Sequence, residues 1–442
     1  MAFTVDRQTI DDLKIFGDNR GNDIFGLFNK THTQGGAHIL KEMFMYPRSS
    51  AQEINYRVQA IRCLKEQGVS FPFDNTIFDT ISFYLSDTDP RTRLSMDQDN
   101  MKRKFEHLIG SDMQYQQLDK GITATLQFLT EFYDFATALE GNPLVAGFQE
   151  NLAGVRAILN IPELAFIKGG VKIAKRSYEK TASFDELFRF RISASILKLL
   201  FYAYELDVFI AVGEVSKSRG FEFAAINESE VNTIEMEGVY HPLVPGAVPN
   251  NIIINEDHNM IFLTGANMAG KSTFMKTFSI AVYLAHLGFP VSAKSMRFSI
   301  QNGMFTTINL ADNLNMGFSH FYAEVSRVKK VAEAVNSSER LIVVFDELFR
   351  GTNVKDAYEA TVAVVAAFAN KRKCTFIIST HIIEAGEELR KLRDSVRFVY
   401  LPTEMQGNKP QYTYTLKEGI TSDRHGMLII ENEKILDILN LA

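Results

Sequence analysis

The sequence predicts a mainly helical N-terminal half followed by an α/β half with a mainly parallel central sheet. In the first half, apolar residues recur at steps of three and four, which places them on one face of a helix: Leu118, Ile122, Leu126, Leu129 and Tyr133. In the second half, short apolar runs alternate with helical patterns, as strands buried on both faces of a layered α/β fold do. These runs are residues 251–255, 260–264, 341–345 and 375–379.

The change of pattern places a domain boundary between Ser218 and Asn232. Just before it, Ile192–Val215 is a long apolar stretch that predicts a mostly buried helix. We therefore expect two domains, a helical one at residues 1–225 and an α/β one at residues 226–442.

The composition limits the classes of protein that need considering. The 442 residues are 46% hydrophobic and 23% charged, as is usual for globular proteins. No apolar run approaches the roughly 20 residues that a membrane-spanning helix needs, and the N-terminus carries acids, unlike a secretory signal. Cys63 and Cys374 lie far apart, which argues against a disulfide or zinc scaffold and indicates a cytoplasmic protein without membrane attachment. A net charge of −6 gives no support for non-specific DNA binding by the whole molecule, although a local basic face remains open.

A glycine-rich segment between a predicted strand and the predicted helix Thr273–Leu287 fits the pattern G-x-x-x-x-G-K-[ST]. Glycines let successive backbone N–H groups and the helix N-terminus face a β-phosphate. Lys271 would place its charge against the β- and γ-phosphates, and Ser272 would offer its hydroxyl to Mg²⁺. The alternative, a glycine-containing turn that binds nothing, is disfavoured by the flanking strand and helix. The segment therefore predicts an ABC-type P-loop NTPase domain that holds ATP with Gly265, Ala266, Asn267, Met268, Ala269, Gly270, Lys271 and Ser272.

Two further strand ends carry candidate catalytic residues. Leu341–Glu347 is an apolar strand that ends in two acids, and Asp346 is placed to hold the Mg²⁺ water shell. Glu347 can activate the attacking water as general base. Strands often end in solvated acids, so the order of motifs along the chain decides for the catalytic interpretation. His381 follows the strand Thr375–Ser379; we predict that it senses the γ-phosphate, and a structural histidine is the alternative.

A predicted helix opens at Ser319 and has one apolar face, formed by Val325, Val328, Ala332 and Val335. Serine is a favoured N-cap, which is reason enough for its presence. Gly317, Ser319 and the helix N-terminus can also meet a γ-phosphate. Because the P-loop occupies its own helix end, that phosphate would belong to a partner subunit.

Four segments in this order resemble the MutS family of DNA mismatch repair ATPases: residues 264–277, 311–325, 345–360 and 377–382. In the N-terminal half, Leu27–Gly36 and Tyr204–Val208 resemble the core, or lever, domain of that family. The resemblance implies that Thr273 completes the ATP site, that Ser272 and Asp346 hold Mg²⁺, and that Glu347 is catalytic. It also implies that Ser319 acts in trans, that His381 senses the γ-phosphate, and that Asn353 lies in a loop near the nucleotide. Members of the family work as dimers with composite sites, so we expect a homodimer.

The sequence also departs from the family pattern. Phe349 stands where the family has glycine, Thr307 and Asn309 replace arginine and glycine, and Val248 replaces the aromatic residue expected against adenine. The chain begins almost at the core, so we expect no mismatch-reading domain. The wedge tripeptide Phe-x-Glu occurs at Phe148, but in a helical stretch of the wrong domain, and we interpret it as coincidence.

Five basic residues, Lys168, Lys172, Lys175, Arg176 and Lys180, form either a solvated helix face or a phosphate-contacting patch. The leading hypothesis is an ATP-driven homodimer that acts on duplex or branched DNA without reading mismatches, with repair or recombination proteins as further partners. The alternative is a nucleotide-switched protein-interaction module that does not bind DNA directly. A mismatch repair initiator is a third possibility, which the expected lack of a reading domain disfavours.

Overall fold

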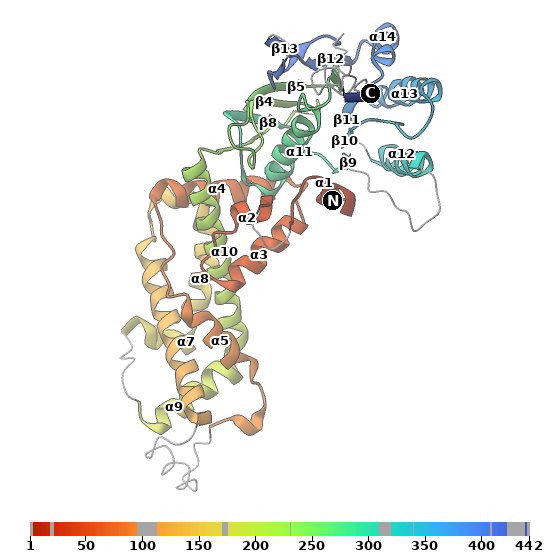
Figure 1. Ribbon diagram of the computed structural model, residues 1–442. Coiled ribbons are helices and arrows are strands. Elements are labelled where there is room, and N and C mark those ends of the chain that lie inside the picture. The colour runs from red at the N-terminus through yellow and green to blue at the C-terminus, as the bar shows by residue number, and fades with distance from the viewer. Residues whose placement is uncertain are drawn as a thin grey trace. The chain divides into compact units, whose positions relative to one another are not determined.

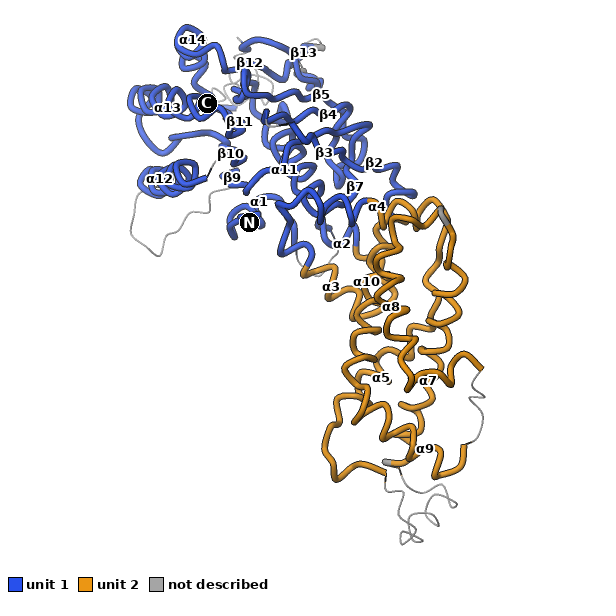
Figure 2. The backbone as a smooth tube through the Cα atoms, turned by 180° about the vertical axis from the view of Figure 1, so that it is seen from behind, with its two compact units in different colours: residues 1–28, 43–58, 215–442 blue, residues 29–42, 59–214 orange. Residues whose placement is uncertain are grey.

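The computed structural model describes residues 3–17, 22–94, 113–169, 176–229, 231–308, 320–338, 340–406, 409–421 and 438–439. The chain separates into two compact units (Figures 1 and 2). Unit 1 comprises residues 1–28, 43–58 and 215–442, and unit 2 comprises residues 29–42 and 59–214. None of the helices in these described ranges is long and apolar enough to cross a membrane.

A seven-stranded sheet forms the centre of unit 1, in the order β1-β9-β10-β11-β6-β12-β15. All neighbours are parallel except β12 and β15, so the predicted mainly parallel sheet is confirmed. The strands are β1 (Thr4–Val5), β6 (Met260–Gly265), β9 (Gly303–Thr307), β10 (Leu341–Phe345), β11 (Thr375–Ser379), β12 (Val396–Leu401) and β15 (Lys417–Glu418). The predicted strands at 260–264, 341–345 and 375–379 are thus confirmed, and each is buried along its whole length.

Helices cover both faces of this sheet. Alternate residues of β10, such as Val343 and Phe345, pack with α12 (His320–Ser337), α13 (Val354–Ala369) and α14 (Ile383–Leu392) in one hydrophobic core. Helix α11 (Lys271–Leu287) lies on the opposite side of β9, β10 and β11 (Figure 1). Because the central strands β6, β10 and β11 lie between helices, both of their faces are buried, which explains their hydrophobic runs.

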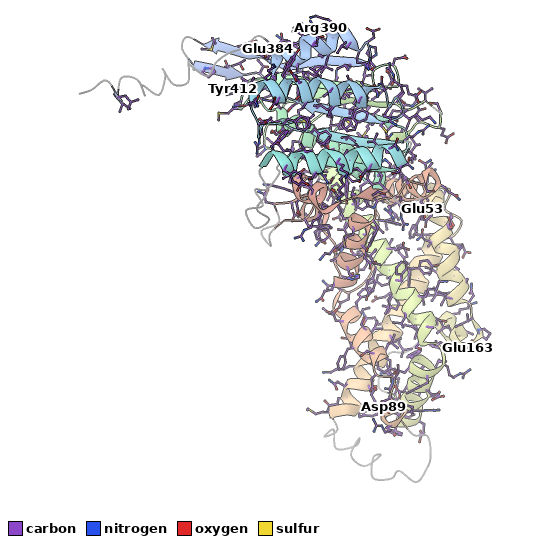
Figure 3. All side chains as sticks on the ribbon, turned by 90° about the vertical axis from the view of Figure 1, so that its right-hand side faces the viewer. Glu53, Asp89, Glu163, Glu384, Arg390 and Tyr412 are labelled. Atoms are coloured by element: carbon purple, nitrogen blue, oxygen red, sulfur yellow. The ribbon has the colours of Figure 1, made fainter. Side chains whose placement is uncertain are left out.

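A second sheet of four strands stands beside the first, in the order β3-β8-β4-β5. Its strands are β3 (Ala225–Ile226), β4 (Ile234–Val239), β5 (Asn250–Ile254) and β8 (Ser295–Phe298). Strand β4 runs antiparallel to both of its neighbours, and β5 confirms the predicted strand at 251–255. Two short antiparallel pairs complete the strands: β2 (Glu222–Phe223) with β7 (Pro290–Val291), and β13 (Thr403–Gln406) with β14 (Lys409–Tyr412). In Figure 3, the labelled Tyr412 lies on β14, and Glu384 and Arg390 lie on α14.

The N-terminus belongs to unit 1, because β1 pairs in parallel with β9 at the sheet edge. Helix α1 (Arg7–Asp12) follows, and the Asp12 carboxylate accepts hydrogen bonds from Thr306 Oγ1 at 2.7 Å and from Ile308 N at 2.9 Å. Helix α2 (Ile24–Phe28) also lies in unit 1. The units are therefore discontinuous in sequence, whereas the expected division was continuous at residue 225.

Unit 2 is built from helices. They are α3 (Gln34–Met45), α4 (Ala51–Gln67), α5 (Thr76–Ser86), α7 (Met113–Ala138), α8 (Gln149–Leu159), α9 (Tyr178–Asp185) and α10 (Ser193–Arg219), and the chain passes between the units within α3, α4 and α10. Short helical segments join them: η1 (Pro90–Thr92), η2 (Pro143–Phe148), η3 (Pro162–Gly169) and η4 (Glu186–Arg191). The predicted helix 192–215 is confirmed by α10, and the periodic run after Leu118 is confirmed by α7, where Ile122, Leu126 and Leu129 are fully buried.

Buried polar groups of unit 2 find partners inside the unit. Asp207 accepts hydrogen bonds from His32 N, Thr33 N and Thr33 Oγ1 at 2.8 to 3.0 Å, just before α3 begins. The buried Arg189 is paired with the buried Asp185. Asp89, labelled in Figure 3, caps η1 by accepting from Arg91 N at 2.9 Å. These polar groups are thus satisfied within unit 2.

Candidate active site

The P-loop connects the end of β6 to the start of α11, as the motif predicted. Gly265 has φ +147° and Gly270 has φ +100°, which side chains rarely tolerate. A Cβ at Gly265 would lie 3.2 Å from Leu401 O, and one at Gly270 would lie 3.0 Å from the Tyr414 ring. Both glycines are therefore required by the backbone and by their neighbours. Met268, between them, also has positive φ, and its side chain is exposed.

Lys271 and Ser272 are the first residues of α11 and lie next to the candidate catalytic acids Asp346 and Glu347. Lys271 Nζ donates to Gly265 O at 2.9 Å and to Ala266 O at 3.2 Å, so its charge lies over the loop. Burial lowers the pKa of this ammonium, and Asp346 and Glu347 partly offset that effect. Ser272 Oγ donates to Asp346 Oδ2 at 2.5 Å. The P-loop and the end of β10 thus form one site.

Asp346 and Glu347 are held by backbone contacts to the neighbouring strands. Asp346 N donates to Thr307 O at 2.9 Å, and Glu347 N donates to Ser379 O at 3.1 Å. The second oxygen of Asp346 accepts from the Ser379 hydroxyl. Hydrogen bonds to the neighbouring strands therefore set the positions of Asp346 and Glu347.

His381 meets the predicted general base directly. Its Nε2 lies 2.6 Å from Glu347 Oε1. This hydrogen bond, together with the charges of His381, Lys271 and Arg350, outweighs the effect of burial and lowers the pKa of Glu347 to about 2. Glu347 is consequently a carboxylate at neutral pH, and the sequence-predicted catalytic pair lies together.

The oxygen atoms at this junction fit Mg²⁺. The Ser272 hydroxyl and the Asp346 carboxylate already touch, and Mg²⁺ prefers such hard oxygen ligands. Mg²⁺ is usually bound by one or two carboxylates together with substrate phosphates, not by an all-protein cage. Consistently, the described ranges contain no group of three or more His, Cys, Asp or Glu side chains suited to a metal.

A cavity of about 630 Å³ lies beside the P-loop. Its walls include His241, Val244, Val248 and Tyr414. Burial, together with nearby Lys276 and Lys14, lowers the pKa of His241 to about 4, so this histidine is neutral at physiological pH. Away from Lys271 and Glu347, which also line it, the cavity offers a partly apolar space next to the P-loop, suited to a nucleoside.

Tyr414 is a candidate site residue that the sequence analysis missed. Asn250 Nδ2 donates to Tyr414 O at 2.9 Å, and Leu416 N donates to Asn250 Oδ1 at 2.8 Å. These bonds hold the C-terminal segment over Gly270 and supply an aromatic ring to the cavity that Val248 does not. No spacing in the sequence could have placed Tyr414 there, because it lies 144 residues after Gly270 in sequence (414 minus 270).

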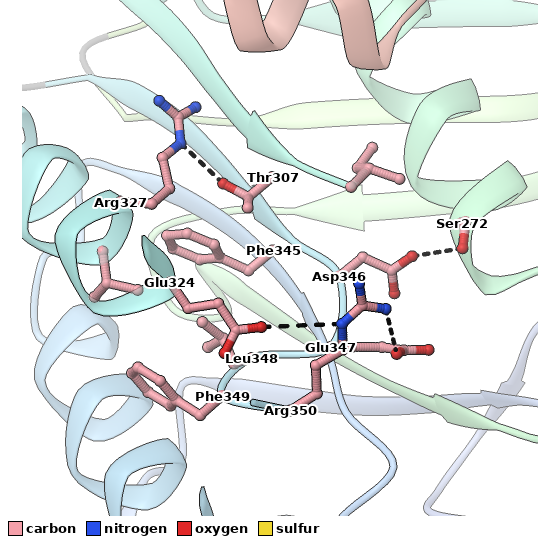
Figure 4. A pocket seen from close by; sticks show the side chains of 12 residues that line it. Ser272, Thr307, Glu324, Arg327, Phe345, Asp346, Glu347, Leu348, Phe349 and Arg350 are labelled. Atoms are coloured by element: carbon pink, nitrogen blue, oxygen red, sulfur yellow. Dashed lines mark hydrogen bonds and ion pairs between the residues drawn. The ribbon is translucent and has the colours of Figure 1, made fainter. Parts of the chain in front are cut away.

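A smaller cavity of about 160 Å³ is lined by the two candidate catalytic acids (Figure 4). Besides Asp346 and Glu347, its lining includes two buried charged residues of α12, Glu324 and Arg327. Arg327 Nε donates to Thr307 Oγ1 at 3.1 Å, and its Nη2 donates to Thr306 O at 2.6 Å.

The predicted apolar face of α12 was wrong in part. Val325 and Ala332 are exposed, whereas Glu324, Arg327, Val331 and Val335 are buried. The two charged residues can lie on the inner face because each has partners there: Gly351 N for Glu324, and Asp6 for Arg327. A paired charge can thus occupy a position that hydrophobic periodicity assigns to an apolar residue.

The remaining predicted site residues lie in different places. Asn353 caps α13, accepting from Asp356 N at 3.0 Å, and Thr273 lies in the first turn of α11 and lines the large cavity with Asn267 and Ala269. Gly317 and Ser319, and the departure at Asn309, lie outside the described residues.

Of the five basic residues expected to form either a solvated helix face or a phosphate-contacting patch, one has a buried side chain. The Arg176 side chain is only 4% exposed and is bound to Asp119 at 2.7 Å. Lys168 and Lys180 are exposed, and Lys172 and Lys175 lie outside the described residues. The Arg176 side chain is therefore paired within unit 2.

Comparison with known proteins finds similarity to one family over the second half of the chain. Residues 261–438 match the family model of MutS domain V. The chain is similar to proteins named "DNA mismatch repair protein MutS": it is 28% identical over 226 residues to that of Persephonella marina, which is 50% of this chain and 25% of the relative. For Clostridioides difficile the identity is 30% over 199 residues (43% and 21%), and for Bacillus velezensis it is 28% over 244 residues (53% and 27%). The similar regions thus span about half of this chain and about a quarter of each relative.

Proposed function

Because this chain belongs to the MutS family through its domain V, we propose that it binds Mg²⁺ and ATP and hydrolyses the ATP to drive conformational change on DNA. The observation that supports the proposal best is the convergence of Ser272, Asp346, Glu347 and His381 at the P-loop. The ends of two strands, β10 and β11, and the P-loop thus supply a candidate metal-binding pair, Ser272 and Asp346, and a candidate base, Glu347, with its partner His381.

Each residue has a definite task in this proposal. The backbone N–H groups of the P-loop and the N-terminus of α11 bind the phosphates, with Lys271 as the cation. Ser272 and Asp346 hold Mg²⁺, which neutralises charge on the phosphate oxygens. Glu347 orients and deprotonates the attacking water, and His381, now bound to Glu347, reports on the γ-phosphate. The nucleoside occupies the cavity beside Tyr414 and Val248.

The proposal includes an ABC-type arrangement of two copies. Gly317 and Ser319 of each copy would approach the nucleotide of the other, and Asn353, at the start of α13, would lie near the same interface. ATP would then hold the two copies together, and hydrolysis would release them. Helices α3, α4 and α10, in which the chain passes between the units, would carry the change to unit 2.

The proposed substrate structure is duplex or branched DNA, bound without recognition of a mismatch. The name of the relatives supports a role in mismatch-repair-related DNA metabolism. The ring of Phe148 is 3% exposed and packs against Phe209, so it does not project as a wedge.

One observation favours the alternative, a nucleotide-switched module that binds a protein and not DNA. Arg176, central to the candidate DNA-binding patch, is paired internally with Asp119. A patch reduced in this way would supply less phosphate affinity.

The two functions are distinguished by measuring ATP hydrolysis and fluorescence polarisation with homoduplex, mismatched and branched DNA. We expect binding that weakens with added salt and hydrolysis that changes with DNA. A clear preference for mismatched DNA would contradict the absence of mismatch reading. Failure to bind any DNA at low salt, with nucleotide-dependent capture of a purified repair protein, would favour the alternative.

A further inference from the structure

We propose that helix α12 sets the position of Glu347 through three residues, Glu324, Phe349 and Arg350, which act as positioning residues for hydrolysis. The expected effect on hydrolysis rests on the proposed ATPase function, whereas the contacts between α12 and the loop after β10 do not depend on it. The loop concerned is residues 347–351, which follows β10 and is called here the catalytic loop.

Glu324 is the first fastening point. Glu324 is 7% exposed, and its carboxylate accepts a hydrogen bond from Gly351 N at 3.3 Å. The same carboxylate lies 4.0 Å from Arg350 Nε. A buried carboxylate is retained at low cost only when its partners stay in place, so Glu324 ties α12 to the end of the catalytic loop.

Arg350 carries this connection to the general base. Its Nη1 donates to Glu347 Oε2 at 3.5 Å (Figure 4). The other oxygen of Glu347 is bound by His381 at 2.6 Å. One oxygen of Glu347 is thus bound by His381, which follows β11. The other is bound by Arg350, whose Nε lies near the Glu324 carboxylate of α12. The direction of the Glu347 carboxylate therefore depends on where α12 lies.

Phe349 is the second fastening point and does not depend on charge. Its φ is +60°, a conformation that is strained for a residue with a side chain, and Glu347 two residues earlier has φ +57°. The Phe349 ring is 3% exposed and packs edge-on against Phe321 of α12, with centroids 6.1 Å apart. Burial of the ring offsets the backbone strain, so the contact with α12 keeps the loop in this conformation.

The helix is itself anchored one turn further on. Arg327 binds Asp6 and donates to Thr306 O of β9. Glu324 therefore lies on a part of α12 that Arg327 holds against the sheet. A shift of α12 must either carry the catalytic loop with it or break the contacts at Glu324 and Phe349.

The test compares Glu324→Met, which keeps the volume and removes the acceptor, with Glu324→Gln, which keeps an acceptor for Gly351 N and removes the charge. The matched control is Glu333→Met, on the exposed face of the same helix, where Glu333 pairs only with exposed Lys329. Hydrogen exchange of the peptide spanning the catalytic loop is measured without nucleotide. Steady-state kinetics give kcat and KM for ATP, and a fluorescent ATP analogue gives binding.

We expect faster exchange in the catalytic loop of Glu324→Met, no change in Glu333→Met, and partial rescue in Glu324→Gln. We expect kcat to fall by about tenfold in Glu324→Met while KM and analogue binding stay within about twofold, because only the transition-state geometry is disturbed. Unchanged exchange and unchanged kcat in Glu324→Met would overturn the inference, as would a loss confined to nucleotide binding. If the wild type hydrolyses no ATP but exchange rises only in the Glu324 variants, the proposed function fails and the fastening stands.

Discussion

Backbone strain is concentrated at the nucleotide site. Among the described residues, five other than glycine have positive φ: Lys14, Met268, Glu347, Phe349 and Tyr414. All except Lys14 line one of the two cavities at the P-loop and the catalytic acids. Such conformations persist only where surrounding contacts enforce them, and they are typical of sites that hold reactive groups in fixed positions.

Phe349→Gly separates the two effects of this residue. Glycine accepts φ +60° without strain, but it removes the ring from Phe321 and opens a cavity in the core. We expect net destabilisation of about 2–4 kcal/mol, from the usual cost of phenylalanine truncation less the relieved strain, and a lower kcat. Urea denaturation and steady-state ATP hydrolysis measure the two quantities.

A turnover that rises in Phe349→Gly would contradict the positioning role and would indicate that phenylalanine restrains the chemistry. Phe321→Leu is the companion variant, because it replaces the ring of α12 that Phe349 packs against and leaves the catalytic loop unchanged. It should lower kcat in the same direction and by less.

At the scale of elements, strand β1 forms one edge of the seven-stranded sheet, and helix α1 follows it. Asp6 joins them to α12, since its carboxylate binds Arg327 and lies 3.2 Å from Lys330 Nζ. Asp6 also caps α1 by accepting from Thr9 N at 3.0 Å. Burial alone would raise the pKa of Asp6, but the Arg327 guanidinium and the Thr9 contacts outweigh it and lower the pKa to about 2.

This shift predicts a pH-dependent contribution to stability. A folded-state pKa below the unfolded value of about 3.8 means that the contribution is fully present above pH 4 and is lost as the pH falls through 2. Asp6→Asn should therefore destabilise unit 1 by about 2 kcal/mol at pH 7, and the difference from wild type should shrink between pH 4 and pH 2. Denaturant unfolding at several pH values measures it.

The matched control is Asp11→Asn on the same helix, where the Asp11 carboxylate forms an exposed ion pair with Arg7. Pairs of that kind contribute little, so this variant should unfold like the wild type. An Asp6→Asn variant as stable as Asp11→Asn at pH 7 would show that β1 is held without the Asp6 contacts.

At the scale of the whole molecule, the two units differ in what they can bind. The P-loop, the catalytic acids and both cavities belong to unit 1. A ligand stabilises the folded unit that binds it by an amount set by its concentration relative to Kd. Mg²⁺ with a non-hydrolysable ATP analogue at about 100 times Kd should therefore stabilise unit 1 by about 2.7 kcal/mol.

Thermal unfolding followed by hydrogen exchange reports on each unit separately. Peptides from unit 1 should be protected by the analogue, and chelation of Mg²⁺ should reduce the protection. Lys271→Ala should abolish it, because the phosphates lose their cation. Equal protection in Lys271→Ala would argue against binding at the P-loop.

Much of unit 1 could be predicted because its strands lie between helices. The runs at 260–264, 341–345 and 375–379 are mostly apolar, and the P-loop pattern is specific, so both were placed from sequence. The position of β1 could not be predicted, since Thr4–Val5 is too short to differ from a loop and its partner β9 lies about 300 residues away. The buried face of α12 was misassigned because Glu324 and Arg327 are paired charges, and Tyr414 was missed because only the folded chain brings it to Gly270.

The central claim, that the site at Glu347 hydrolyses ATP, is tested most directly by steady-state hydrolysis with Mg²⁺ in the wild type and in Glu347→Ala. Loss of a general base typically costs 10²–10⁴-fold, so we expect kcat to fall by about 100-fold or more while a fluorescent ATP analogue still binds. Equal turnover by the two proteins would contradict the assignment of Glu347 as the base and, with it, the account of this site.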